Sequence, residues 1–287
     1  MPLGLFDWLD VLSSNLVNLT GTSWFNIITF FGLWTTIWLP IAFFVARLVN
    51  WQSSEPLTSQ QKLALLGSLY LIVPPIVWFR VERESLSLTD LGLSYGSDSF
   101  WYILLGLAVS SLGLLVIFSL ETASKLIDWH WHNLSEVPQL VLPILSLSLV
   151  ISLVEEVVFR GYVFATLRTD NSLWWAAIAS SLIFAALHLV WERKQTLPQL
   201  PGLFLMGVVL VLARVLVGDR IYFAIGLHAG WIWGLTCIDS ANLLSYKYSD
   251  HWFTGIKQQP LAGLGGILCI LVTGFAVWSA SGSQLLF

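Results

Sequence analysis

The chain has 287 residues, of which 56% are apolar and only 10% are charged, and its mean hydropathy is +0.78. Soluble globular domains carry about 25% charged residues, so this composition excludes that class and indicates a multi-pass integral membrane protein in contact with the lipid bilayer. The formal net charge of −4 and the lack of a basic run in the sequence give no reason to expect nucleic acid as a partner.

Eight segments are candidate membrane-spanning helices, because one span takes about 20 mostly apolar residues. Continuous apolar runs exclude the alternating strands of a membrane barrel. We therefore predict an all-α bundle of about eight transmembrane helices, with an internal polar cavity for the charged residues among them. The segments are residues 24–48, 62–79, 100–120, 138–167, 173–190, 202–217, 220–238 and 261–280.

The N-terminal part of the chain gives three local expectations. Asp7 and Asp10 occur without a basic stretch, so no cleaved signal peptide is expected. Thr58 and Gln61 have the spacing of a capping box, which predicts a helix start at this point. Pro74 and the proline after it should bend or break the same helix near its end.

The fourth apolar segment contains three ionisable residues, Glu155, Glu156 and Arg160. Charged groups in the middle of a bilayer are costly and usually face a protein interior with a partner, so this cluster predicts a functional site. Glu156 and Arg160 are four residues apart and share a helix face, which predicts an ion pair. Glu155 is rotated by about 100° from Glu156, so the two carboxylates should point in different directions.

Two further spans each contain a histidine, His188 and His228. From the helical rise and alternating spans, Glu156 lies roughly 17 Å below one membrane face, His188 roughly 22 Å and His228 roughly 14 Å. All three depths fall in the middle of a hydrocarbon core about 30 Å thick. We therefore expect the carboxylates and the histidines to converge on one cavity that water can reach.

Two kinds of hydrolytic chemistry suit two glutamates and two histidines. In the first, the two histidines and one of the glutamates bind a divalent metal ion such as zinc, and the other glutamate is the general base toward a bound water. In the second, glutamate and histidine activate water without a metal, and the other histidine stabilises the oxyanion. Either form would hydrolyse a carbonyl compound, most simply a peptide bond.

The sequence resembles the CPBP family of intramembrane metalloproteases, which includes the type II CAAX prenyl endopeptidases and the bacterial Abi proteins. Three motifs carry the resemblance, in the family's order. Glu155, Glu156 and Arg160 match Glu-Glu-x-x-x-Arg, Phe184 and His188 match Phe-x-x-x-His, and His228 matches the first position of His-x-x-x-Asn/Asp.

The resemblance implies an eight-helix bundle with a conical cavity and a glutamate-activated water. It implies that Glu155 is the catalytic base, Glu156 a supporting ligand or partner and Arg160 their positioning residue. It also implies that His188 binds metal or the activated water, and that His228 binds metal or steadies the oxyanion. The implied substrate is a peptide or protein, with a lipid-modified CAAX tail as one option.

One position departs from the family pattern. Ile232 stands where the third motif has Asn or Asp. If that position donates a hydrogen bond to the oxyanion, its loss lowers the rate by about 10²–10³. Trp231 could offer its indole N–H instead, although it lies one residue off that helix face.

The sequence predicts three regions and leaves two other functions open. Residues 1–137 would hold three spans and their loops, residues 138–240 the motif-bearing core, and residues 241–287 a loop and the last span.

One alternative to an endopeptidase is a non-catalytic factor that assembles or stabilises a membrane-protein complex, which Ile232 favours. The other is a proton or ion transporter that uses Glu155 and Glu156, although the chain shows no repeat symmetry.

Overall fold

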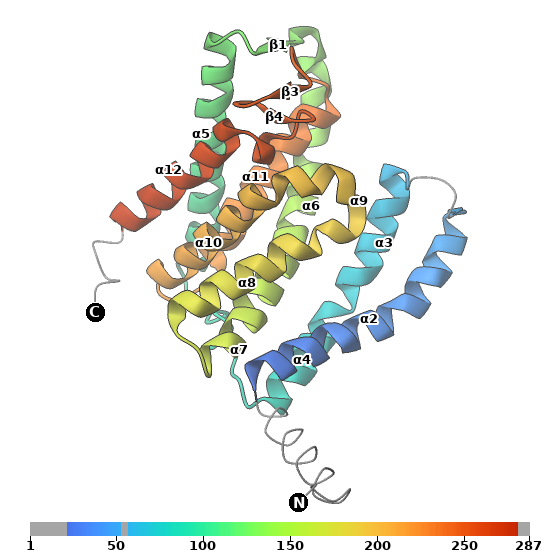
Figure 1. Cartoon of the computed structure of the whole chain (residues 1–287), viewed down its shortest axis with the longest axis vertical. Coiled ribbons are helices and arrows are strands. Elements are labelled where there is room, and N and C mark those ends of the chain that lie inside the picture. The colour runs from blue at the N-terminus through green and yellow to red at the C-terminus, as the bar shows by residue number, and fades with distance from the viewer. Residues whose placement is uncertain (1–21, 53–56, 281–287) are drawn as a thin grey trace, which may run out of the picture. The chain divides into compact units, whose positions relative to one another are not determined.

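The computed structural model describes residues 22–52 and 57–280, which are mostly helical (Figure 1). Helices form at all the predicted span positions, so the all-α, multi-pass fold is confirmed. Among the described residues, six helical segments are long and apolar enough to cross a membrane. They are Ser23–Leu48, Ser59–Arg83, Ser99–Ala123, Trp131–Arg168, Leu173–Trp191 and Arg193–Leu216. The segment with Asp7 and Asp10 lies outside the described residues.

The two remaining predicted spans are also helices. They are α11 (Tyr222–Ser240) and α12 (Leu264–Ala280). The helix α12 is apolar but shorter than the six segments above. The predicted number of eight spans therefore stays a prediction, although each of the eight positions is helical.

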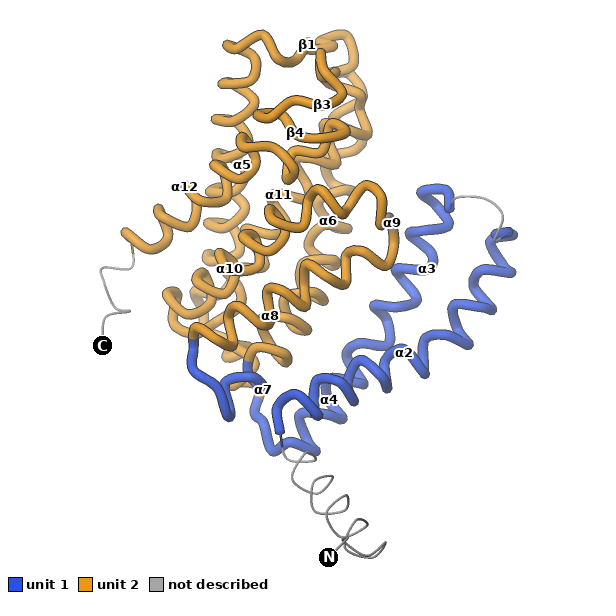
Figure 2. Tube along the Cα trace, viewed as in Figure 1, with its two compact units in different colours: residues 1–87, 165–173 blue, residues 88–164, 174–287 orange. Residues whose placement is uncertain are grey.

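The chain forms two compact units (Figure 2). Unit 1 comprises residues 1–87 and 165–173, and unit 2 comprises residues 88–164 and 174–287. The motif-bearing residues from Glu155 to Arg160 and from Phe184 to His228 all belong to unit 2. The sequence-based division at residues 137 and 240 is a different partition of the chain and stays a prediction.

Unit 1 contains α2 (Ser23–Leu48), α3 (Ser59–Leu71) and α4 (Val73–Arg83). The predicted capping box starts α3, because the Gln61 backbone N–H donates to Thr58 Oγ1 at 3.3 Å and the Thr58 N–H donates to Gln61 Oε1 at 3.0 Å. The predicted break is also present, since α3 ends before Ile72 and α4 begins with its prolines in the first turn. A proline has no N–H to donate and is best accommodated in the first turn of a helix, which explains the position of the break.

Unit 2 is built around α11. The helices α5, α6 and α10 pack against it, and α12 packs against α5 and α10. The helices of this unit are α5 (Ser99–Ala123), α6 (Val137–Glu156), α8 (Leu173–Leu187), α9 (Leu189–Thr196), α10 (Leu200–Leu216), α11 and α12. Short 3₁₀ turns η1 (Trp131–Glu136), η3 (Leu197–Gln199) and η4 (Pro260–Ala262) link them.

Glycines let α5 and α11 approach closely. A Cβ atom added to Gly226 would collide with the backbone oxygen of Ile103, and one added to Gly230 would collide with Ser110 Oγ. Small residues at a helix interface allow this kind of backbone contact in membranes. The contact fixes α11, and therefore His228 between these two glycines, against α5.

The two ends of unit 2 differ in their connections. At one end, Arg220 Nη1 and Nη2 donate to the two carboxylate oxygens of Asp98 at 2.7 and 2.8 Å. These hydrogen bonds hold the pKa of Asp98 below its usual range, so the pair that joins the starts of α5 and α11 stays charged at acidic pH. At the other end, β1 (Ile127–Trp129) pairs with β2 (Leu244–Tyr246), and β3 (Asp250–His251) with β4 (Gly255–Ile256), both antiparallel.

The fourth predicted span is not a uniform α-helix. It continues from α6 through a π-helical segment, η2 (Val157–Val163), to α7 (Phe164–Arg168). A π-helical turn leaves backbone carbonyls without their usual α-helical partners and is frequent at functional sites. Apolar periodicity does not reveal this change, so it could not be predicted from the sequence.

The close contact between α5 and α11 leads to a stability prediction. We expect Gly226→Ala to destabilise the protein by about 1–3 kcal/mol, because the added methyl group collides with backbone that cannot rotate away. Gly32→Ala in α2 is the matched control, since nothing lies within 4 Å of its added Cβ. Thermal unfolding in detergent would measure both variants, and equal midpoints would contradict the prediction.

Candidate active site

Adjacent glutamates at the end of α6 lie in different environments. Glu156 is fully buried, with 0% of its side chain exposed, whereas the Glu155 side chain is 13% exposed. Glu155 lines a cavity in unit 2, and Glu156 is not among the residues that line it. The rotation of about 100° between neighbouring helical residues accounts for this difference, as the sequence predicted.

The Glu156 carboxylate is the centre of a buried polar network. Its Oε1 atom accepts a hydrogen bond from Arg160 Nη1 at 3.0 Å and another from His228 Nδ1 at 2.8 Å. Arg160 and His228 are almost fully buried as well. A buried ion pair is tolerated only when its charges are paired and hydrogen-bonded, so this network joins the end of α6 and η2 to the middle of α11.

Phe184 packs against the charged part of this network. The Arg160 guanidinium lies 4.2 Å from the centre of the Phe184 ring, a cation–π contact. The same ring lies 4.5 Å from the His188 ring and 6.0 Å from the His228 ring. The phenylalanine of the second motif therefore packs against Arg160 and against both histidines, which helps to fix their positions.

Hydrogen bonds determine which nitrogen of each histidine carries the proton. His188 Nδ1 is 2.8 Å from the Phe184 carbonyl oxygen, and His228 Nδ1 is 2.8 Å from a Glu156 carboxylate oxygen. Both partners accept only, so both Nδ1 atoms must donate. In the neutral rings each Nε2 therefore keeps a lone pair, which suits contact with water or a metal ion.

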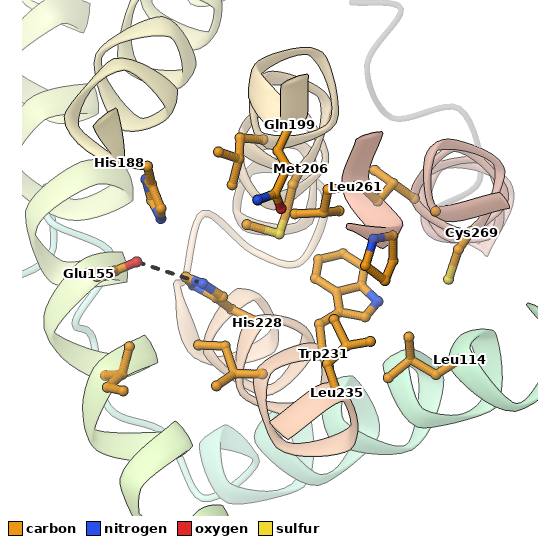
Figure 3. A pocket seen from close by; sticks show the side chains of 16 residues that line it. Leu114, Glu155, His188, Gln199, Met206, His228, Trp231, Leu235, Leu261 and Cys269 are labelled. Carbon is orange, nitrogen blue, oxygen red and sulfur yellow. Dashed lines mark ion pairs between the residues drawn. The ribbon is translucent and has the colours of Figure 1, made fainter. Parts of the chain in front are cut away.

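The Nε2 side of each histidine ring belongs to the cavity. Glu155, His188 and His228 line one end of it, and Figure 3 shows their side chains pointing toward one another. Glu155 Oε2 is 3.7 Å from His228 Nε2. Glu155 and both histidines thus line one cavity, whereas Glu156, which was expected there too, does not line it and bonds His228 Nδ1.

The rest of this cavity is mostly apolar. Its volume is about 310 Å³, and its wall is formed by α5, α6, η3, α10, α11, η4 and α12, with His188 from the junction between α8 and α9. Among its lining residues, Gln199 is the one with a side-chain amide. Apolar lining residues are Leu114, Ile151, Leu203, Met206, Trp231, Ile232, Leu235, Leu261 and Ile270.

The Ile232 side chain has no hydrogen-bond donor to offer to the cavity. Ile232 is among the lining residues. The indole nitrogen of Trp231 points away from Glu155 and His188 in Figure 3, and it has no oxygen or nitrogen partner among the described residues. Trp231 is therefore not placed to replace the missing Asn or Asp side chain.

Sequence reasoning missed the role of Arg214. This buried residue of α10 donates to the carbonyl oxygens of Arg160 and Gly161 within the π-helical segment, and to the Asp90 carbonyl oxygen at 2.5 Å. Its Nε atom also pairs with Asp219 at 3.0 Å. Arg214 thus satisfies carbonyls of the π-helix behind the site. A cation inside an apolar span was the available signal, but the sequence does not show its partners.

A catalytic metal ion needs three protein ligands directed at one point. Of the expected ligands, His188 and His228 present Nε2 atoms to the cavity, whereas Glu156 Oε1 is engaged by Arg160 and His228. Among the described residues, no three His, Cys, Asp or Glu side chains are gathered closely enough to hold a metal ion. As arranged here, the residues do not fit a metal site, and the ligand set of Glu156, His188 and His228 stays a prediction.

Known proteins resemble the part of the chain that carries the site. Residues 137–234 match the family model described as type II CAAX prenyl endopeptidase Rce1-like. The chain is thus a multi-pass membrane protein with an Rce1-like domain, and the match covers Glu155, Glu156, Arg160, His188 and His228. This finding confirms the resemblance to the family that the three motifs indicated.

A further similarity is to a bacterial protein. An Escherichia coli protein described as an uncharacterized 24.3 kDa protein is 31% identical over 84 residues. The similarity covers 29% of this chain and 37% of that relative, so the chain spans little more than a third of the relative's length. No solved structure matches the chain.

The two glutamates should respond differently to neutralisation. We expect Glu156→Gln to destabilise the protein by about 3–5 kcal/mol, because it leaves the buried Arg160 without its counter-charge. Glu155→Gln should change stability by less than about 1 kcal/mol, because Glu155 is partly exposed at the cavity. Thermal unfolding in detergent at pH 7 distinguishes these effects, and a Glu155 variant as unstable as the Glu156 variant would refute the assignment.

Proposed function

We propose that the protein is an intramembrane endopeptidase in which Glu155 activates a water molecule for attack on a peptide bond. The observation that carries this proposal is the cavity end where Glu155, His188 and His228 meet, with Glu156 holding His228 from behind. The Rce1-like match of residues 137–234 supports a peptidase of the CAAX type. The substrate would be a peptide or protein presented within the bilayer, and a lipid-modified CAAX tail is one option.

The proposed reaction begins with proton transfer to a Glu155 oxygen. The carboxylate takes a proton from water while the water oxygen bonds to the carbonyl carbon of the scissile peptide. His188 Nε2, with its lone pair toward the cavity, accepts the second hydrogen of that water and orients it. The product of this step is a tetrahedral intermediate with negative charge on the former carbonyl oxygen.

His228 then acts as proton carrier and electrophile. Its Nε2 atom lies 3.7 Å from Glu155 Oε2, so a proton can pass between them with a small movement. The resulting imidazolium is stabilised through Nδ1 by the Glu156 carboxylate, as the aspartate of a catalytic triad stabilises its histidine. In this form Nε2–H donates to the oxyanion, and the proton finally leaves with the amine when the C–N bond breaks.

A metal ion would change how the water is activated. A divalent cation supplies a Lewis acid and lowers the pKa of a bound water. Because the described side chains are not gathered as a three-ligand site, the steps above use only the groups of the chain. The metal content of the purified protein, measured with and without chelator beside its peptidase activity, decides between the two forms of the mechanism.

A non-catalytic role in assembling a membrane complex is the second candidate. Ile232 favours it, because the residue brings an apolar side chain where the family motif has a hydrogen-bonding one. Against it stands the retained set of two glutamates and two histidines in one network. Stable co-purification of a partner protein without turnover of any peptide would support this second candidate.

Removing the Glu155 carboxylate should abolish cleavage. We expect Glu155→Gln to lower the rate by at least about 10²-fold, because the amide cannot accept the proton of water. The assay would use proteoliposomes with prenylated and unprenylated peptides, and mass spectrometry would identify the products. Glu136→Gln, at an exposed position before α6, is the matched control and should keep the wild-type rate. Cleavage by the Glu155 variant at the wild-type rate would disprove the proposal.

Restoring a hydrogen-bond donor at position 232 should raise the rate. We expect Ile232→Asn to increase kcat by up to about 10²-fold, since one oxyanion donor is worth about 10²–10³ in rate. Leu203→Asn adds the same amide to the cavity wall on α10 and serves as the control. An equal or lower kcat in the Ile232 variant, with Leu203→Asn at the wild-type rate, would show that this position does not face the oxyanion.

A further inference from the structure

A second cavity lies beside the candidate active site in unit 2. Its volume is about 540 Å³, and it is formed by the end of α11, by β2 and by the turns near η3 and η4. The two cavities share four lining residues, which are Gln199, Leu235, Pro260 and Leu261. The two cavities therefore adjoin each other, and we call the second one the polar chamber.

The polar chamber differs chemically from the active-site cavity. Its lining side chains are rich in hydrogen-bonding groups, whereas the active-site cavity is mostly apolar beyond its catalytic end. Four side-chain amides line the chamber, together with one acidic and one basic residue of opposite charge. These residues are Gln199, Asn242, Gln258, Gln259, Asp239 and Lys257.

Other groups at the chamber are neutral hydrogen-bonding partners. Ser245 and Tyr246 on β2 also line it. Burial raises the pKa of the Tyr246 phenol, and the Glu121 and Asp239 carboxylates add to this shift, so the hydroxyl keeps its proton at neutral pH. The chamber thus offers many donors and acceptors and little net charge.

Part of the chamber wall is a turn of unfavourable backbone conformation. Lys257 and Gln258 have φ angles of +55° and +59°, and the Gln259 N–H donates to the Ile256 carbonyl oxygen at 3.1 Å. Two consecutive positive φ angles define a type I′ turn, which normally has Asn-Gly at these positions. Non-glycine residues are uncommon in this conformation, which costs free energy at each position.

The turn is held from two sides. Asp250 Oδ1 accepts the backbone N–H of Lys257 at 2.9 Å, and Lys257 Nζ donates to the Lys194 carbonyl oxygen at 2.9 Å. The strained turn therefore keeps two long polar side chains at the chamber wall, where Asn-Gly would relieve the strain but remove them. We take this as a second observation, independent of the cavity, that the wall has a binding role.

We propose that the polar chamber binds a polar, uncharged segment of the peptide substrate, while the adjoining apolar segment of the same peptide occupies the active-site cavity. This inference rests on the proposed peptidase function and deepens it. The substrate class is then a peptide with an apolar segment followed or preceded by residues such as Ser, Thr, Asn or Gln, cleaved near the junction. The wall amides can donate to and accept from such side chains, whereas they offer no partner to an apolar tail and no net charge to an ionic one.

Binding to an inactive variant tests the chamber separately from catalysis. In the Glu155→Gln background, fluorescence anisotropy would measure two labelled peptides with the same apolar segment, one with a Ser/Asn tail and one with an Ala/Leu tail. Lys257→Asn together with Gln258→Gly should weaken binding of the Ser/Asn peptide at least tenfold, with the Ala/Leu peptide unchanged. The same double change should raise the thermal midpoint, because it supplies the residues that a type I′ turn favours.

Two further variants make the test specific. Lys125→Asn changes another lysine with positive φ (+57°), which follows α5 and does not line the chamber, so it should leave both affinities unchanged. Asn242→Gly removes a chamber amide at a position with φ of +47°, which suits glycine. The change should therefore weaken binding of the Ser/Asn peptide without unfolding the protein.

The outcomes separate this inference from the proposed function. Wild-type affinity of the Ser/Asn peptide in both chamber variants would overturn the chamber inference, as would equal or tighter binding of peptides with Lys or Asp tails. Cleavage by Glu155→Gln at the wild-type rate, with tail selectivity intact, would overturn the proposed mechanism alone. Loss of selectivity in the chamber variants, with catalysis abolished by Glu155→Gln, supports both.

Discussion

The structure of unit 2 depends on one buried carboxylate, that of Glu156. A single oxygen of this group accepts hydrogen bonds from Arg160 and His228, so it neutralises a cation and orients an imidazole at once. In a low-dielectric interior the Arg160 guanidinium could not be buried alone without a large desolvation cost. The position of α11 relative to α6 therefore depends on the hydrogen bonds of this carboxylate, and the glycines of α11 allow its close approach to α5.

The same network assigns different tasks to two neighbouring residues of the same type. Glu156 is sealed behind Phe184 and His228, whereas Glu155 faces the cavity, and only the helical rotation between them makes this possible. The π-helical segment that follows has carbonyls bonded by Arg214, a cation from another helix. The geometry of the candidate site thus depends on two buried arginines. Arg160 balances the charge of Glu156, and Arg214 donates hydrogen bonds to backbone carbonyl oxygens of the π-helical segment.

The sequence predicted those features that follow from local pattern. Apolar run length located the spans, the spacing of Thr58 and Gln61 located a cap, and helical rise brought Glu156, His188 and His228 to similar depths. Non-local features could not be predicted in this way. The π-helical segment accepts hydrogen bonds from Arg214, 54 residues away from Arg160 in the sequence. The polar chamber combines the end of α11 with β2 and the turn at Lys257, which lie outside the predicted spans. Such contacts have no periodicity to read.

Ile232 connects the catalytic question to the binding question. A hydrogen-bond donor at the oxyanion stabilises the transition state more than the substrate, whereas an apolar side chain in the same wall contributes to both states about equally. Interactions of the first kind raise kcat, and those of the second kind lower KM without accelerating the chemical step. With Ile232 in the wall and no donor from Trp231, the cavity is suited to holding an apolar segment tightly and to turning it over slowly. The adjoining polar chamber extends this preference for binding over turnover to the polar segment of an amphipathic peptide, which is the substrate class proposed above.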